Sequence, residues 1–63
     1  MPERKLLLKV AKNYDMTSET EYYMHLAIYK ILSYPVKEDA IREYESLEPK
    51  YKQIIEAKIA SMR

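Results

Sequence analysis

The sequence predicts a small all-α domain, and three observations lead to that prediction. Apolar residues recur in four segments with a period of about 3.6 residues, as in helices, rather than alternating as in strands. Proline and cap-forming residues punctuate the chain at 13–17, 33–35 and 48–49. The 63 residues are too few for more than one domain. We therefore expect a single domain over 1–63, a bundle of three to four short antiparallel helices at about 3–13, 19–33, 35–47 and 49–62, with the second helix central.

The first segment, about 3–13, has an apolar stripe at helical spacing and lysines on the opposite side. The stripe consists of Leu7, Val10, Ala11 and Tyr14 with Leu6 beside them, and the lysines are Lys5, Lys9 and Lys12. Asn13 suits a left-handed C-terminal cap in a chain that has no glycine. A strand over 4–10 is the alternative, because Leu6, Leu8 and Val10 also occupy alternate positions there.

The second segment, about 19–33, begins with a capping box and is apolar around almost its whole circumference. In the capping box, the Ser18 hydroxyl and the Glu21 carboxylate each accept a hydrogen bond from an otherwise unpaired amide, and Pro35 ends the helix. From 22 to 32 only His25 and Lys30 are neither apolar nor tyrosine. One face carries Met24, Ala27, Ile28 and Ile31, with Tyr23 at its edge. The other face carries Tyr22, His25, Leu26, Tyr29 and Leu32.

This all-round apolar helix indicates a partner. A helix that is apolar on every side has to be buried on every side, and a short chain has little material to enclose it. Tyrosine and histidine combine an apolar body with a polar tip, which is typical of protein interfaces. We therefore predict that the face with Tyr22, His25, Leu26, Tyr29 and Leu32 docks onto another chain, either a larger subunit or a second copy. The alternative is that the other helices cover both faces and leave only tyrosine hydroxyls in water.

The third and fourth segments each begin with a proline that fits the first turn of a helix, Pro35 and Pro49. The third, about 35–47, has an inner stripe formed by Val36, Ala40, Tyr44 and Leu47. The fourth, about 49–62, has an inner stripe formed by Tyr51, Ile54, Ile55, Ile59 and Met62. Because the link between them is so short, the sequence allows either one helix kinked at Pro49 or two helices meeting at a sharp corner.

The net charge of +1 hides blocks of opposite sign. Residues 1–12 and 49–63 are mainly basic, whereas residues 13–29 and 38–48 are mainly acidic. Either the opposite blocks pair across the bundle, or the first and last helices form a basic patch. In the second case the candidates for contact with a nucleic-acid backbone or an acidic surface are Arg4, Lys5, Lys9 and Lys12.

Several kinds of chemistry have no residues to carry them. Without cysteine there is neither a disulfide nor a thiolate metal site, and without glycine there is no phosphate-binding loop. His25 follows Glu21 at helical spacing, with Glu19 nearby, but a single histidine with carboxylates on one helix is a weak pattern for a metal. We expect a protein with no metal, no cofactor and no enzymatic activity.

Together these features favour a small accessory or adaptor subunit that binds and stabilises a larger protein. Abundant lysine and glutamate without cysteine is typical of thermophiles, and such a chain suits an archaeal information-processing complex such as a replicative DNA polymerase holoenzyme. No apolar run is long enough to span a membrane and no signal peptide is expected, so we expect a soluble, cytoplasmic protein.

The alternative function is a dimeric DNA-binding regulator. With a strand over 4–10, the order of elements resembles a ribbon-helix-helix repressor, which implies that Lys5, Leu7 and Lys9 enter the major groove. The third and fourth segments would otherwise form a helix-turn-helix whose reading helix carries Lys50, Lys52, Gln53 and Glu56. Its supporting helix is acidic, which opposes binding to phosphates.

Overall fold

The computed structural model describes residues 1–62 and confirms the all-α prediction. Its four helices are α1 (Arg4–Lys12), α2 (Glu19–Leu32), α3 (Lys37–Glu45) and α4 (Pro49–Ser61), and no strand occurs among the described residues. The strand alternative for 4–10 is therefore wrong. The apolar residues of this segment point inward at helical spacing, since Leu7, Val10 and Ala11 are all fully buried.

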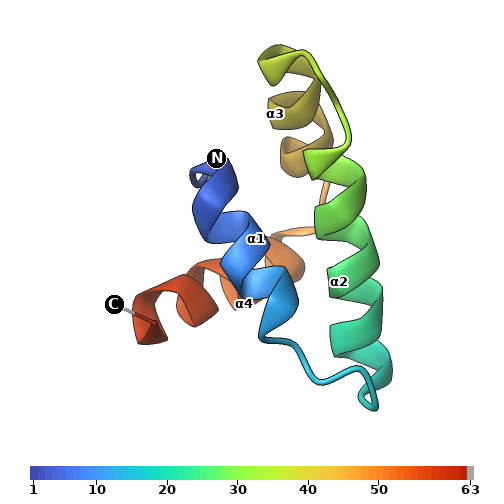
Figure 1. Ribbon diagram of the computed structural model, residues 1–63, viewed down its shortest axis with the longest axis vertical. Helices are drawn as coiled ribbons and strands as arrows, with labels where there is room; N and C mark the ends of the chain where they lie inside the picture. The colour runs from blue at the N-terminus through green and yellow to red at the C-terminus, as the bar shows by residue number, and fades with distance from the viewer. Residues whose placement is uncertain (63) are drawn as a thin grey trace.

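The first three helices run antiparallel, and α4 departs from that arrangement by crossing behind α1 (Figure 1). α1 packs against α2 and α4, and α2 packs against α1 and α3, so α1 shares the centre of the fold with α2. α3 and α4 are two separate helices that meet at a sharp corner over residues 46–48, not one kinked helix. Pro49 occupies the first turn of α4, where its missing N–H leaves no bond unmade.

The core draws side chains from all four helices and from Tyr14, which follows α1. Its members are Leu7, Val10, Ala11, Tyr14, Met24, Ile28, Ile31, Ala40, Tyr44, Ile55 and Ile59. The predicted stripe of α1 is buried as expected, whereas the stripes of the last two segments are buried only in part. The exposed members of those stripes are Val36, Ile54 and Met62. α4 has α1 as its main neighbour, and a single neighbouring helix covers only part of a stripe.

Three helix ends differ from expectation. The Ser18 hydroxyl accepts a hydrogen bond from the Glu21 backbone N–H at 3.4 Å, as the capping box requires, but the Glu21 carboxylate accepts from the Asp15 N–H instead. Asn13 is not left-handed, with φ at −97°; its side chain donates to the Lys9 carbonyl at 2.8 Å and so pairs an end carbonyl by another route. Pro35 precedes α3 rather than starting it, because Val36 is the N-cap.

The extent of the core is ordinary for a folded monomer. The accessible surface of the protein is 4405 Å². A monomer of this mass is expected to expose about 4300 Å². The four helices therefore enclose a core of the extent expected for a monomer of this mass.

Candidate functional site

The outward side of α2 exposes large apolar side chains, which we call the tyrosine face. It consists of Tyr22 (49% exposed), Tyr23 (49%), Leu26 (51%) and Tyr29 (38%). The opposite side of the same helix carries Met24, Ile28 and Ile31, which are all buried. Of the two alternatives for residues 22–32, the structure thus shows the one in which a face of α2 stays uncovered. That the tyrosine face binds another chain stays a prediction.

His25 and Leu32, predicted to belong to this face, are half-buried instead. His25 Nδ1 lies 3.0 Å from the Ala11 carbonyl oxygen, and because a carbonyl only accepts, Nδ1 carries the proton. This hydrogen bond joins α2 to the end of α1, where carbonyls lack partners within the helix. The His25 ring also meets Tyr29 edge-on, with ring centroids 4.6 Å apart, and Leu32 packs against the core. Both roles depend on neighbouring helices, so spacing along the sequence does not show them.

Tyr23, expected at the edge of the inward face, lies outside it. Its ring packs against that of Tyr51 in α4, with centroids 5.1 Å apart and ring planes at 44°. Beside it is a groove of about 270 Å³ lined by Tyr23, Leu26, Ala27, Lys30, Glu43 and Leu47. Sequence reasoning missed this groove because α3 and the corner after it supply part of the lining.

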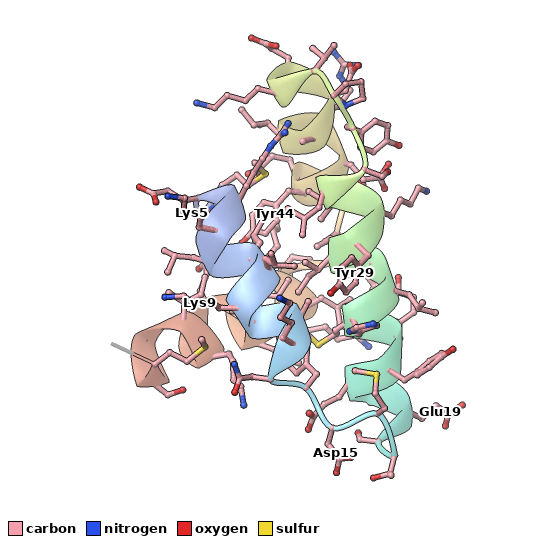
Figure 2. The ribbon with its side chains drawn as sticks, viewed as in Figure 1. Lys5, Lys9, Asp15, Glu19, Tyr29 and Tyr44 are labelled. Atoms are coloured by element: carbon pink, nitrogen blue, oxygen red, sulfur yellow. The ribbon has the colours of Figure 1, made fainter. Side chains whose placement is uncertain are left out.

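A second surface, which we call the lysine face, lies on the outward side of α1 and consists of Lys5, Lys9 and Lys12. All three are exposed residues, and Figure 2 shows Lys5 and Lys9 pointing away from α2 and from the core. Within residues 1–62 none of the three forms an ion pair. Arg4, predicted to act with them, donates from Nη2 to the Tyr34 carbonyl at 3.1 Å, and so joins the start of α1 to the link between α2 and α3.

The acidic block around α3 is paired locally with nearby bases. Its ion pairs are Glu43 with Lys30, Asp39 with Arg42, Glu48 with Lys50 and Glu45 with Lys52, at 3.1 to 3.8 Å. The two interpretations of the charge pattern therefore apply to different regions. Opposite charges pair around α3, whereas the lysine face of α1 stays unpaired within residues 1–62. Because the pairs are partly exposed, each adds little to stability.

The titratable groups inside the fold are tyrosines held neutral. Tyr44 donates its hydroxyl proton to Glu56 Oε2 at 3.1 Å, and burial together with this bond raises the pKa of Tyr44 above its ordinary value. Burial raises the pKa of Tyr14 to about 12, and its buried hydroxyl has no hydrogen-bond partner among residues 1–62. Such phenols supply no charge for acid–base chemistry near neutral pH.

Metal-binding clusters and membrane-spanning helices do not occur in the described part of the chain. No group of three histidine, cysteine, aspartate or glutamate side chains is close enough together in residues 1–62 to hold a metal ion. Across the same residues, no helix has both the length and the hydropathy that crossing a bilayer requires.

The fold and these surfaces define a small helical domain with two chemically different outward faces. No protein-family model matches the sequence, and no curated protein and no solved structure matches it either. We therefore base the proposed function on the two faces.

Proposed function

We propose that this protein is a non-enzymatic accessory subunit that docks onto a larger protein through the tyrosine face of α2. The observation that supports the proposal is the exposure of Tyr22, Leu26 and Tyr29 at 38% to 51% on one side of a single helix. Contiguous apolar side chains on the surface of a folded monomer are typical of protein interaction sites. Tyrosine is also enriched where interfaces bury their centre.

The groove beside the tyrosine face gives the proposed partner a place to insert a side chain. Tyr23, Leu26 and Leu47 make its lining mainly apolar, and the Lys30–Glu43 ion pair, at 3.7 Å, adds a polar pair. An amphipathic helix recognised in this way would place one apolar anchor in the groove and lay neighbouring turns along Tyr22 and Tyr29. The proposed partner is thus a protein with an exposed amphipathic helix.

Reading of DNA bases has less support than docking to a protein. The ribbon-helix-helix alternative needs a strand over 4–10, and that segment is α1. In the helix-turn-helix alternative, two side chains of the proposed reading helix, Lys52 and Glu56, are engaged in contacts with other residues of this chain. Lys52 Nζ lies 3.5 Å from Glu45 Oε2, and Glu56 accepts the hydrogen bond of Tyr44.

Composition supports a more specific setting for the proposed subunit. Its abundant lysine and glutamate and its lack of cysteine suit a cytoplasmic thermophile protein. An archaeal information-processing complex, such as a replicative DNA polymerase holoenzyme, is the setting that we propose on this basis.

The test compares the protein with the double variant Leu26→Glu/Tyr29→Glu in an affinity purification from native lysate. We expect the native protein to retain a stoichiometric partner and the variant to lose it, because two carboxylates would be buried against the partner. A matched control is Val36→Glu/Ile54→Glu, which changes two apolar residues of similar exposure, 49% and 40%, outside α2. Far-UV circular dichroism should show the same helicity for all three proteins.

Light scattering identifies the kind of partner. If the native protein has the mass of two chains and the Leu26→Glu/Tyr29→Glu variant has the mass of one, the partner is a second copy of the chain and not a larger subunit. A monomer that retains no stoichiometric protein, or a double variant that retains the same one, would contradict the proposal.

A further inference from the structure

We infer that the lysine face of α1 is a second binding surface, which contacts the phosphate backbone of a nucleic-acid duplex without reading its bases. This inference goes beyond the proposed docking through α2 and does not depend on it. It rests on the placement, the charge and the composition of the surface around Lys5, Lys9 and Lys12.

The three lysines form a row along α1. They lie four and three residues apart, so one helix face presents all of them, at a rise of about 1.5 Å per residue. The other side of α1 carries Leu7, which is fully buried. The core therefore fixes the direction of the row, and Figure 2 shows Lys5 and Lys9 projecting from the outer edge of the molecule.

The charge of this row is not neutralised within residues 1–62. Among residues 1–62, Lys30, Arg42, Lys50 and Lys52 each have a carboxylate partner within 4 Å. Lys5, Lys9 and Lys12 have none there, and neither do Lys37 and Lys58. Between positions 4 and 14 the sequence contains no aspartate or glutamate. Figure 2 shows Asp15 and Glu19 at the far end of the molecule from Lys5.

α4 adds positive charge near the end of the same helix. Lys58 Nζ lies 5.9 Å from the centroid of the Tyr14 ring, two residues beyond the end of α1. α4 packs against α1, so the basic blocks at 1–12 and 49–62 adjoin in space although they are far apart in the sequence. The near-balanced net charge of +1 is therefore unevenly distributed, because the basic blocks of these two helices adjoin.

The composition of the lysine face selects the kind of anion. A protein interface has an apolar or aromatic centre and is depleted in lysine, and this row has lysines without such a centre. A single-stranded nucleic acid is held by aromatic side chains that stack on bases, and the row offers none. Lysine binds phosphate as a point charge and needs no further geometry, which suits the backbone of a duplex.

The test measures binding of a fluorescein-labelled DNA duplex by fluorescence anisotropy over a series of salt concentrations. We expect affinity at low salt that falls steeply as salt rises. The variant Lys5→Gln/Lys9→Gln/Lys12→Gln should bind more weakly, and its plot of log affinity against log salt should be shallower by about 0.9 for each phosphate that the variant no longer neutralises. Glutamine has a helix propensity close to that of lysine, so circular dichroism should be unchanged.

Two controls separate this surface from general charge and from the tyrosine face. The variant Lys30→Gln/Lys50→Gln/Lys52→Gln removes the same charge from lysines that are already ion-paired, and it should keep the salt slope of the native protein. The uncharged variant Leu26→Ala/Tyr29→Ala should bind the duplex normally even where it loses a protein partner. Failure of one binding mode is then distinguishable from failure of the other.

Three results would overturn the inference. The first is no salt-dependent binding of the duplex at low salt, and the second is an unchanged slope in the Lys5, Lys9 and Lys12 variant. The third is displacement of the duplex by polyglutamate at equal charge concentration, which would make the surface one for acidic proteins.

Discussion

α1 and α2 are alike on their inward sides and different on their outward sides. Inside, Leu7 and Val10 of α1 meet Ile28 and Ile31 of α2 in the same core, and all four are fully buried. Outside, α1 presents charged lysines, whereas α2 presents tyrosine and leucine that are 38% to 51% exposed. The buried side chains of the two helices are thus similar because they pack in one core. The exposed side chains differ, and this difference is the basis for proposing a different kind of partner for each helix.

The difference also shows which helix leaves apolar surface exposed to water. α1 is an ordinary amphipathic helix, because its polar side faces water at no cost. α2 leaves apolar area in water that only another surface can remove, at about 25 cal/mol for each Å² buried. The docking proposed for α2 should therefore be long-lived, whereas the contact proposed for α1 should depend on salt concentration.

The largest expected effect comes from truncating the inward sides. Leu7→Ala in α1 and Ile28→Ala in α2 should each lower the free energy of unfolding by about 2–5 kcal/mol, because each leaves a cavity at a fully buried position. Leu26→Ala on the tyrosine face should change it by no more than about 0.5 kcal/mol. Urea denaturation followed by circular dichroism measures all three. A destabilisation at Leu26 as large as that at Leu7 would show that the tyrosine face is packed, not exposed.

The effect of intermediate size is a loss of unfolding free energy at high pH, which we expect from the buried Tyr14 hydroxyl. The folded state holds the phenolic proton of Tyr14 more tightly than the unfolded chain, with a pKa of about 12 against 10.0. The free energy of unfolding should therefore be insensitive to this group below pH 10 and should fall between pH 10 and about 12. Tyr14→Phe should reduce that fall, as measured by urea denaturation over this pH range.

Tyr14→Phe has a second expected outcome at neutral pH. In the part of the chain that the structure describes, the buried Tyr14 hydroxyl has no hydrogen-bond partner, so its removal should not lower the free energy of unfolding. Stability measured at pH 7 and at alkaline pH, on the same samples, checks both statements. If the Tyr14→Phe variant and the native protein lose the same unfolding free energy at alkaline pH, the pH dependence comes from Tyr44 instead.

The smallest expected effect lies where the two helices are joined. His25→Ala removes the hydrogen bond to the Ala11 carbonyl and should lower the free energy of unfolding by about 0.5–1.5 kcal/mol. His25→Asn keeps an N–H donor close to the Nδ1 position and should restore part of that stability. The measurement is again urea denaturation, and equal stability of the alanine variant and the native protein would rule out this hydrogen bond as a contributor.

Much of the helical pattern could be predicted from local features of the sequence. The stripe that includes Leu7 and Val10 predicts α1, and the Ser18 cap and Pro35 predict the limits of α2 to within a residue. The capping predictions for Asn13 and Glu21 failed, because the loop between α1 and α2 determines which groups meet at these helix ends. Asn13 caps α1 through its side chain, and the Glu21 carboxylate turns to the Asp15 N–H, because the loop between α1 and α2 brings those groups together.

The candidate site divides in the same way. The surplus face of α2 could be predicted, since residues 22–32 are apolar on every side. His25 could not be assigned to the end of α1, because fourteen residues separate it from Ala11 in the chain. Pairing of the opposite charge blocks was one of the two alternatives from the sequence. The partners of Glu43 and Glu45 could not be predicted, since Lys30 and Lys52 come from α2 and α4.

The sequence by itself determined that this protein is helical, that α1 has a lysine side and that α2 is apolar all round. Periodicity and capping are local properties, so they can be recognised without knowing the neighbours of a residue in space. Only the tertiary structure decided, within residues 1–62, that Tyr22, Leu26 and Tyr29 stay outside while the lysine face stays unpaired. The physical reason is that burial and ion pairing depend on which helices meet. α4 packs mainly against α1 and reaches the tyrosine face at Tyr23, through Tyr51, so Tyr22, Leu26 and Tyr29 stay exposed.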